Sequence, residues 1–100
     1  MSLTEEVVEN YLFLLDSKGE EDLYRHVVGI GVMRAVRVRN PEIEILNDSE
    51  SFFALYRRTG NDSYFKIGKA LRRAAHKLYR QFLRINTEKD KNARFLHVVE

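Results

Sequence analysis

The stretch from Asp62 to Asn86 constrains the fold of this chain more than any other part of the sequence. At about 100° per residue, its apolar residues fall on one face with the i, i+3, i+4, i+7 spacing of a helix that packs on a core. This stripe consists of Ile67, Leu71, Ala74, Ala75, Leu78, Phe82 and Ile85. Gly68 lies on the same side, where the missing side chain would let a second helix approach closely. The sequence therefore predicts a long amphipathic helix.

The opposite face of this predicted helix carries only positive charge, because no acidic residue follows Asp62 within the stretch. An arc of about 80° holds Lys66, Lys69, Arg73, Lys77, Arg80 and Arg84, and Arg72 and His76 flank it. Like charges spaced in this way destabilise a helix by about 0.2–0.5 kcal/mol per pair. A sequence selected only for a soluble fold gains nothing from the arrangement, so it indicates an anionic partner.

Charge is unevenly distributed along the chain, although the formal net charge is only +2. Residues 1–24 carry seven acids and one lysine, a net charge of −6. Residues 57–84 carry nine bases, including Arg57 and Arg58, and one acid, a net charge of +8. The two ends could therefore bind partners of opposite charge, or each other.

The length of 100 residues and an apolar content of 44% fit one globular domain. Helical spacing also predicts helices near residues 5–16, from Glu20 onward, and near residues 50–58. Residues 87–100 are expected to form a polar loop and a short apolar tail. We therefore expect a single, mainly α-helical domain, a small bundle of four to five helices.

The segment 34–46 is open to two interpretations. Val36, Val38, Ile43 and Ile45 alternate with polar residues on both sides of Asn40-Pro41, which is typical of a short β-hairpin. Asn40 is also a favourable residue just before a helix, and Pro41 is favoured at its first position. The sequence alone does not decide between a hairpin and a helix that breaks at Asn40.

Catalytic and metal-binding patterns are sparse. The chain has no cysteine, which excludes disulfides and cysteine-based metal sites. His26, His76 and His97 do not show the spacing of a metal-binding motif. We therefore expect no enzymatic activity, no cofactor and no metal site. No apolar run approaches the roughly 18 residues of a membrane span, and a cytoplasmic protein is expected.

Nucleic acid, either DNA or RNA, is the partner that the basic arc favours. Arginine can hold phosphate oxygens with two parallel hydrogen bonds, and such contacts provide affinity without reading sequence. We therefore expect a small non-enzymatic nucleic-acid-binding protein or subunit. The expected phosphate contacts come from Lys66, Lys69, Arg73, Lys77, Arg80 and Arg84, with help from Arg57, Arg58 and Arg72.

The alternative hypothesis is a helical adaptor or self-assembling protein. In that case the basic surface binds an acidic protein partner or the acids of a second copy, giving a homo-oligomer. Pairing of acids and bases within one chain would be a purely structural outcome. An anionic membrane surface is not expected to be the partner, because the apolar stripe that a membrane-bound helix needs is required for the core of this small chain.

Overall fold

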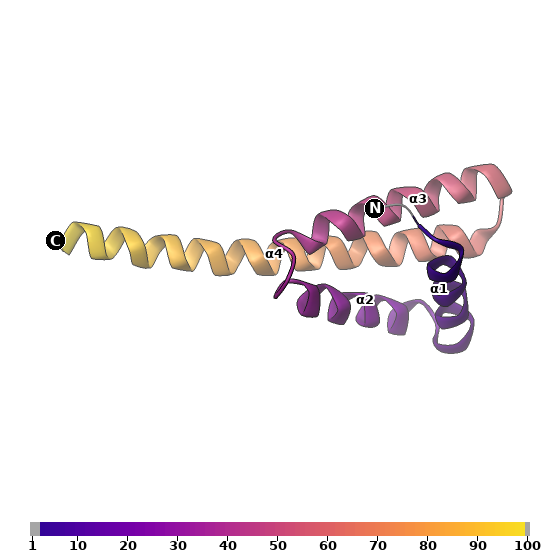
Figure 1. Cartoon of the computed structure of the whole chain (residues 1–100), viewed down its shortest axis with the longest axis horizontal. Helices are drawn as coiled ribbons and strands as arrows, with labels where there is room; N and C mark the ends of the chain where they lie inside the picture. Colours follow the sequence, from indigo (N-terminus) through magenta and orange to yellow (C-terminus); the bar gives the residue numbers. More distant parts are fainter. Residues whose placement is uncertain (1–2, 100) are drawn as a thin grey trace.

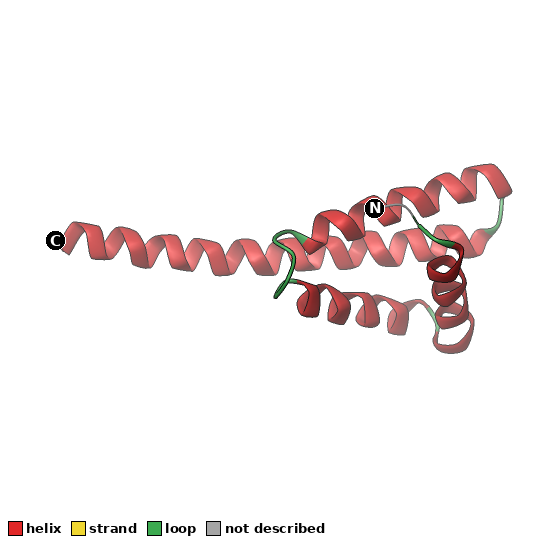
Figure 2. Ribbon diagram, viewed as in Figure 1, coloured by secondary structure: helices red, strands yellow, loops and turns green. Residues whose placement is uncertain are grey.

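The structure of the protein is a computed structural model that describes the backbone of residues 3–99 and the side chains of residues 3–83. Over this part of the chain the fold is all-α, with four helices and no strand (Figure 2). The helices are α1 (Glu5–Lys18), α2 (Glu20–Arg34), α3 (Pro41–Thr59) and α4 (Asp62–Val99). The predicted helical bundle is confirmed.

The other three helices are arranged around the first half of α4 (Figure 1). α2 and α3 both pack along this half, and α1 crosses near its beginning. The second half of α4 projects beyond the other helices, so the molecule is elongated, with extents of 60 × 24 × 20 Å. The first half of α4 is therefore the central element of the bundle.

The predicted apolar stripe of α4 forms the centre of the core. Ile67, Leu71, Ala74 and Leu78 are completely buried. Phe82 is half-buried at the edge of the core, and Ile85 lies outside the described side chains. The other three helices contribute Tyr11, Leu15, Leu23, Tyr24, Val27, Ile45 and Phe52. Each large aliphatic side chain buried here contributes about 1.5–3 kcal/mol, which explains why the stripe directs the packing.

Gly68 allows α3 to approach α4 closely, as its place on the apolar face predicted. A Cβ atom at this position would lie 2.8 and 2.9 Å from two ring carbons of Phe53. The ring of Phe53 also packs against Phe65, with 5.7 Å between the centroids. The absence of a side chain at Gly68 therefore makes room for an aromatic residue of the neighbouring helix.

The hairpin interpretation of residues 34–46 is wrong. α2 ends at Arg34, and α3 begins at Pro41, which occupies the first turn of the helix, where its missing N–H would be unpaired in any case. A hairpin would place the alternating apolar residues on one face. Instead Ile45 is 2% exposed in the core, whereas Val36 is 87% exposed.

α3 is one continuous helix, whereas helical spacing predicted a helix only near residues 50–58. The polar cluster Asn47-Asp48-Ser49-Glu50 precedes most of that range. Ser49 lies within this polar cluster, yet it is completely buried between α3 and α4. Its hydroxyl donates a hydrogen bond to the backbone oxygen of Gly68. The polar residue is therefore part of a helix interface, and the helix starts nine residues earlier than expected, at Pro41.

α4 continues through residues 87–99, where a polar loop and an apolar tail were expected. This segment contains neither glycine nor proline. Polarity alone does not end a helix, because lysine, glutamate and arginine are good helix formers. The helical backbone of this segment corrects the expectation that the helix ends at Asn86.

A tight turn between α3 and α4 determines how the basic helix begins. Gly60 ends α3 in the left-handed conformation (φ 72°), which glycine adopts without steric cost, and its N–H donates to the carbonyl oxygen of Tyr56. The side chain of Asn61 then accepts a hydrogen bond of 3.0 Å from the N–H of Ser63. Asn61 therefore caps the start of α4.

Candidate nucleic-acid interface

The basic face predicted for α4 is open to solvent wherever its side chains are described. The side chains of Lys66, Lys69, Arg72, Arg73, Lys77 and Arg80 are all exposed, and Arg84 lies outside the described side chains. These cations face outward because the apolar stripe on the opposite side of α4 is buried against the other helices. These side chains are therefore exposed to solvent, and they differ in whether a carboxylate of the same chain pairs with them.

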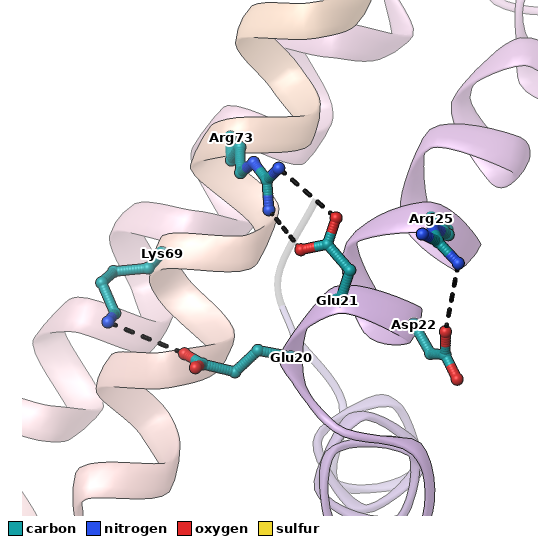
Figure 3. A network of polar contacts seen from close by, with 6 residues as sticks. All are labelled: Glu20, Glu21, Asp22, Arg25, Lys69 and Arg73. Atoms are coloured by element: carbon teal, nitrogen blue, oxygen red, sulfur yellow. Dashed lines mark hydrogen bonds and ion pairs between the residues drawn. The ribbon is translucent and has the colours of Figure 1, made fainter.

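Two of the cations are paired with the beginning of α2 (Figure 3). The guanidinium of Arg73 donates two hydrogen bonds to the carboxylate of Glu21, at 2.7 and 3.4 Å. One turn earlier on α4, Lys69 Nζ lies 3.7 Å from Glu20 Oε1. Acids in the first turn of a helix interact favourably with its dipole, so these glutamates serve both the start of α2 and its docking on α4.

Tyr24 of α2 also contacts the cations of α4. The guanidinium carbon of Arg73 lies 4.0 Å from the centroid of the Tyr24 ring, and Lys77 Nζ lies 5.8 Å from it. A cation over an aromatic face gains about 0.5–1 kcal/mol at an exposed site. The ring of Tyr24 is mostly buried. Tyr24 therefore packs against both cations and connects α2 to α4.

The charges around Glu21 favour its ionised form. The hydrogen bonds from Arg73 lower the pKa of the Glu21 carboxyl, and the positive charges of Arg25 and Lys77 add to this effect, against a smaller opposing effect of desolvation. In return, the hydrogen bond to Glu21 raises the pKa of Arg73. Glu21 is therefore a carboxylate at neutral pH, and the pair with Arg73 is fully charged.

Four α4 cations form no ion pair with a carboxylate among the residues whose side chains are described: Lys66, Arg72, Lys77 and Arg80. Lys66, Lys77 and Arg80 fall within an arc of about 60° on the helix. At a rise of 1.5 Å per residue, the row from Lys66 to Arg80 is about 21 Å long. This row is the part of the predicted basic face that is open to an external anion.

Arg57 and Arg58, the other predicted contributors, lie in the last turn of α3 and are exposed. Arg58 lines a groove between α1 and α3, together with Glu5 and Glu9. Its surroundings are therefore those of α1, and the structure does not place it in the row of cations on α4.

This groove has a volume of about 810 Å³. Its floor is apolar, and it contains Leu3, Val8, Leu12, Ala54, Leu55 and Tyr64. Glu5 and Glu9 line the groove on the side of α1, and Arg58 lines it on the side of α3. The lining therefore combines apolar side chains with charges of both signs.

The acidic and histidine side chains of the described residues do not form a metal site. No three histidine, aspartate or glutamate side chains among them lie close enough to hold a metal ion. Glu42 is 8% exposed, and its Oε2 has no hydrogen-bond partner among the described side chains. It occupies the first turn of α3, where the helix dipole stabilises a carboxylate, so its position has a structural explanation.

The sequence analysis identified the cations but missed the residues that engage them. Glu20, Glu21 and Tyr24 stand at the beginning of α2, about 50 residues from their partners. The only available signal was the excess of acids in the first quarter of the chain. It predicted that opposite charges could meet, without indicating which ones.

Comparison of the chain with protein-family models, with curated proteins and with solved structures gave no match. Among the described helices, none combines the length and the hydropathy that crossing a membrane requires.

Proposed function

We propose that this protein binds nucleic acid, without an enzymatic activity, through phosphate contacts from the exposed face of α4. The contacts come from Lys66, Arg72, Lys77 and Arg80. The observation that carries the proposal is that these cations are exposed and form no ion pair with a carboxylate among the described side chains, although the chain supplies acids to their neighbours Lys69 and Arg73. An excess of unpaired positive charge on one face is the electrostatic footprint of a protein that binds a polyanion.

The dimensions of the row fit a nucleic-acid backbone. One strand of a DNA duplex carries a phosphate about every 3.4 Å along the helix axis. A row of about 21 Å therefore runs past about six phosphates of one strand, if the two axes are aligned. Lysine and arginine that contact only phosphates provide affinity without sequence preference, so we expect binding that depends strongly on salt and weakly on sequence.

The proposal is tested by measuring the affinity for labelled duplex DNA, single-stranded DNA and RNA over a salt series. The test variant is Lys66→Gln, Lys77→Gln and Arg80→Gln. Each lost phosphate contact should reduce the slope of log K against log salt by about 0.9 for duplex DNA. We therefore expect the slope of the triple variant to fall by about 2–3 and its affinity at low salt to fall by more than tenfold.

The matched control carries Lys18→Gln, Arg37→Gln and Arg39→Gln, which remove the same net charge from exposed positions outside α4. Circular dichroism should confirm that both variants keep the helical content of the wild type. An equal loss of affinity in the two variants would mean that only net charge matters. Absence of binding by the wild type at low salt would refute the proposed function.

A second candidate is supported by the acids of α1. Glu5, Glu6, Glu9 and Asp16 are all exposed, and none forms an ion pair with the described side chains. We propose, as this alternative, that they meet the α4 cations of a second copy in a self-assembled protein. Sedimentation velocity should then show association that is lost at high salt. Association should also be lost in the Glu6→Gln and Glu9→Gln variant, a change that nucleic-acid binding should tolerate.

A further inference from the structure

The two ion pairs between α2 and α4 lie within the basic row itself. Lys69 and Arg73 are four residues apart on α4, between Lys66 and Lys77. They point to the same side of the helix, as residues separated by one turn do. Glu20 and Glu21 cover both of them from the first turn of α2 (Figure 3). The carboxylates therefore occupy the middle of the surface that faces a bound anion.

Both ion pairs are open to solvent. The exposed fractions are 57% and 54% for the side chains of Arg73 and Glu21, and 53% and 48% for those of Lys69 and Glu20. Exposed ion pairs contribute little to stability, because water screens the charges and the side chains lose entropy. A phosphate that reaches this surface can therefore displace a carboxylate without unfolding the interface, which also contains Tyr24 and the buried side chains of α2.

The geometry of the Arg73–Glu21 pair resembles that of a phosphate contact. A guanidinium uses the same two parallel N–H groups to bind a carboxylate or a phosphate. The Glu21 carboxylate also lies in the field of Arg25 and Lys77. Arg73 thus contacts the carboxylate directly, and an incoming phosphate would meet the same guanidinium and the positive charges of Arg25 and Lys77.

We infer that Glu20 and Glu21 are internal competitors for phosphate, which occupy Lys69 and Arg73 until the backbone of a nucleic acid displaces them. This inference rests on the proposed function and deepens it, because it assigns two residues that set the affinity of the surface. Among its described side chains, α4 has four open cations in the free protein and six in the complex. The exchange weakens binding, because the nucleic acid must displace the two carboxylates. In return, the free protein does not hold six uncompensated positive charges on one helix.

The test is a comparison of the wild type with the double variant Glu20→Gln and Glu21→Gln, using the same labelled duplex DNA and salt series. Release of two exposed ion pairs should raise the affinity about 2- to 30-fold near 0.1 M salt. Because removal of any two acids also raises the net charge, the control variant is Glu9→Gln and Asp16→Asn. These two acids form no ion pair with α4 among the described side chains.

A double-mutant cycle separates direct competition from a general charge effect. Lys69→Gln and Arg73→Gln are introduced into the wild type and into the Glu20→Gln, Glu21→Gln variant. If the acids act through these two cations, neutralising the acids raises the affinity only when Lys69 and Arg73 are present. An equal gain in both backgrounds, or a gain no larger than that of the control variant, would overturn the inference.

The outcomes also distinguish this inference from the proposed function. Binding by the wild type with an unchanged affinity in the Glu20→Gln, Glu21→Gln variant refutes the competitor role and leaves the proposed function in place. Binding that appears only in that variant refutes the proposed function and shows that nucleic acid does not displace the two carboxylates. Absence of binding in both proteins refutes both. Thermal unfolding of each variant, followed by circular dichroism, shows whether α2 remains docked on α4.

Discussion

The hydroxyl of Ser49 on α3 donates a hydrogen bond of 2.8 Å to the backbone carbonyl oxygen of Gly68 on α4. Ser49 is completely buried, and Gly68 has no side chain to separate the two helices. The contact therefore joins a polar side chain of α3 directly to the backbone of α4. It explains how a polar cluster that looks like a loop in the sequence can lie within a helix.

Replacement of Ser49 by alanine should destabilise the protein by about 0.5–1.5 kcal/mol, because a buried hydrogen bond is lost. Ser51→Ala is the control. The Ser51 hydroxyl bonds only to the carbonyl oxygen of Asn47 within the same helix, and alanine is the better helix former. Urea unfolding measures both changes. Equal stability of the two variants would show that the Ser49 contact does not hold α3 on α4.

Two glycines of α2 should respond to alanine in opposite ways. A Cβ atom at Gly31 would overlap the side chain of Leu78 and lie 3.2 Å from Ile45 Cδ1, whereas nothing lies within 4 Å of a Cβ atom at Gly29. Overpacking a core costs about 1–3 kcal/mol, and alanine in a helix gains about 1 kcal/mol over glycine. We expect Gly31→Ala to lower the thermal midpoint and Gly29→Ala to raise it. A rise in both would place Gly31 outside the core contact.

The contact between Tyr24 and Arg73 should be measurable as a coupling free energy. Tyr24→Phe keeps the aromatic ring and should resemble the wild type in stability. Tyr24→Leu removes the ring, and in a double-mutant cycle with Arg73→Ala we expect a coupling of about 0.5–1 kcal/mol. Urea unfolding provides the four free energies. A coupling of zero would mean that Arg73 is held by Glu21 alone.

Asp48 should make stability depend on pH in an unusual direction for a carboxylate. Desolvation raises the pKa of Asp48, although Arg34 opposes the shift and Glu44 increases it. The folded protein therefore binds this proton more tightly than the unfolded chain does. The stability contribution of Asp48 is lost as the pH rises from the unfolded pKa, near 3.9, through the raised pKa of the folded state.

Asp48→Asn should consequently be more stable than the wild type at neutral pH, because the neutral amide avoids the cost of desolvating a carboxylate. The difference between the two proteins should shrink as the pH falls toward the unfolded pKa of aspartate. Comparison of the two unfolding free energies at each pH removes the contribution of the other carboxylates. A variant that is less stable than the wild type at pH 7 would contradict the prediction and would indicate a favourable interaction of Asp48 with Arg34.

The core of α4 could be derived from the sequence because helical periodicity is a local property. The spacing of Ile67, Leu71, Ala74 and Leu78 places their side chains on one face whatever surrounds the helix. The same periodicity places the cations on the other face. The sequence did not reveal the path of residues 34–59, because alternating apolar residues and a polar cluster are compatible with a strand, a loop or a helix. The burial of Ile45 and Ser49 against α4 decided it.

The sequence also could not show which cations are free of an ion pair and which are paired with a carboxylate. Lys66, Lys69, Arg73 and Lys77 are equivalent by spacing and charge, so the sequence by itself determined only that they share the exposed side of one helix. The docking of α2 distinguished them, because it brings Glu20 and Glu21 to Lys69 and Arg73 across about 50 residues of chain. Local periodicity determines which way a side chain points. Its partner depends on distances between helices, and only the tertiary structure decides those.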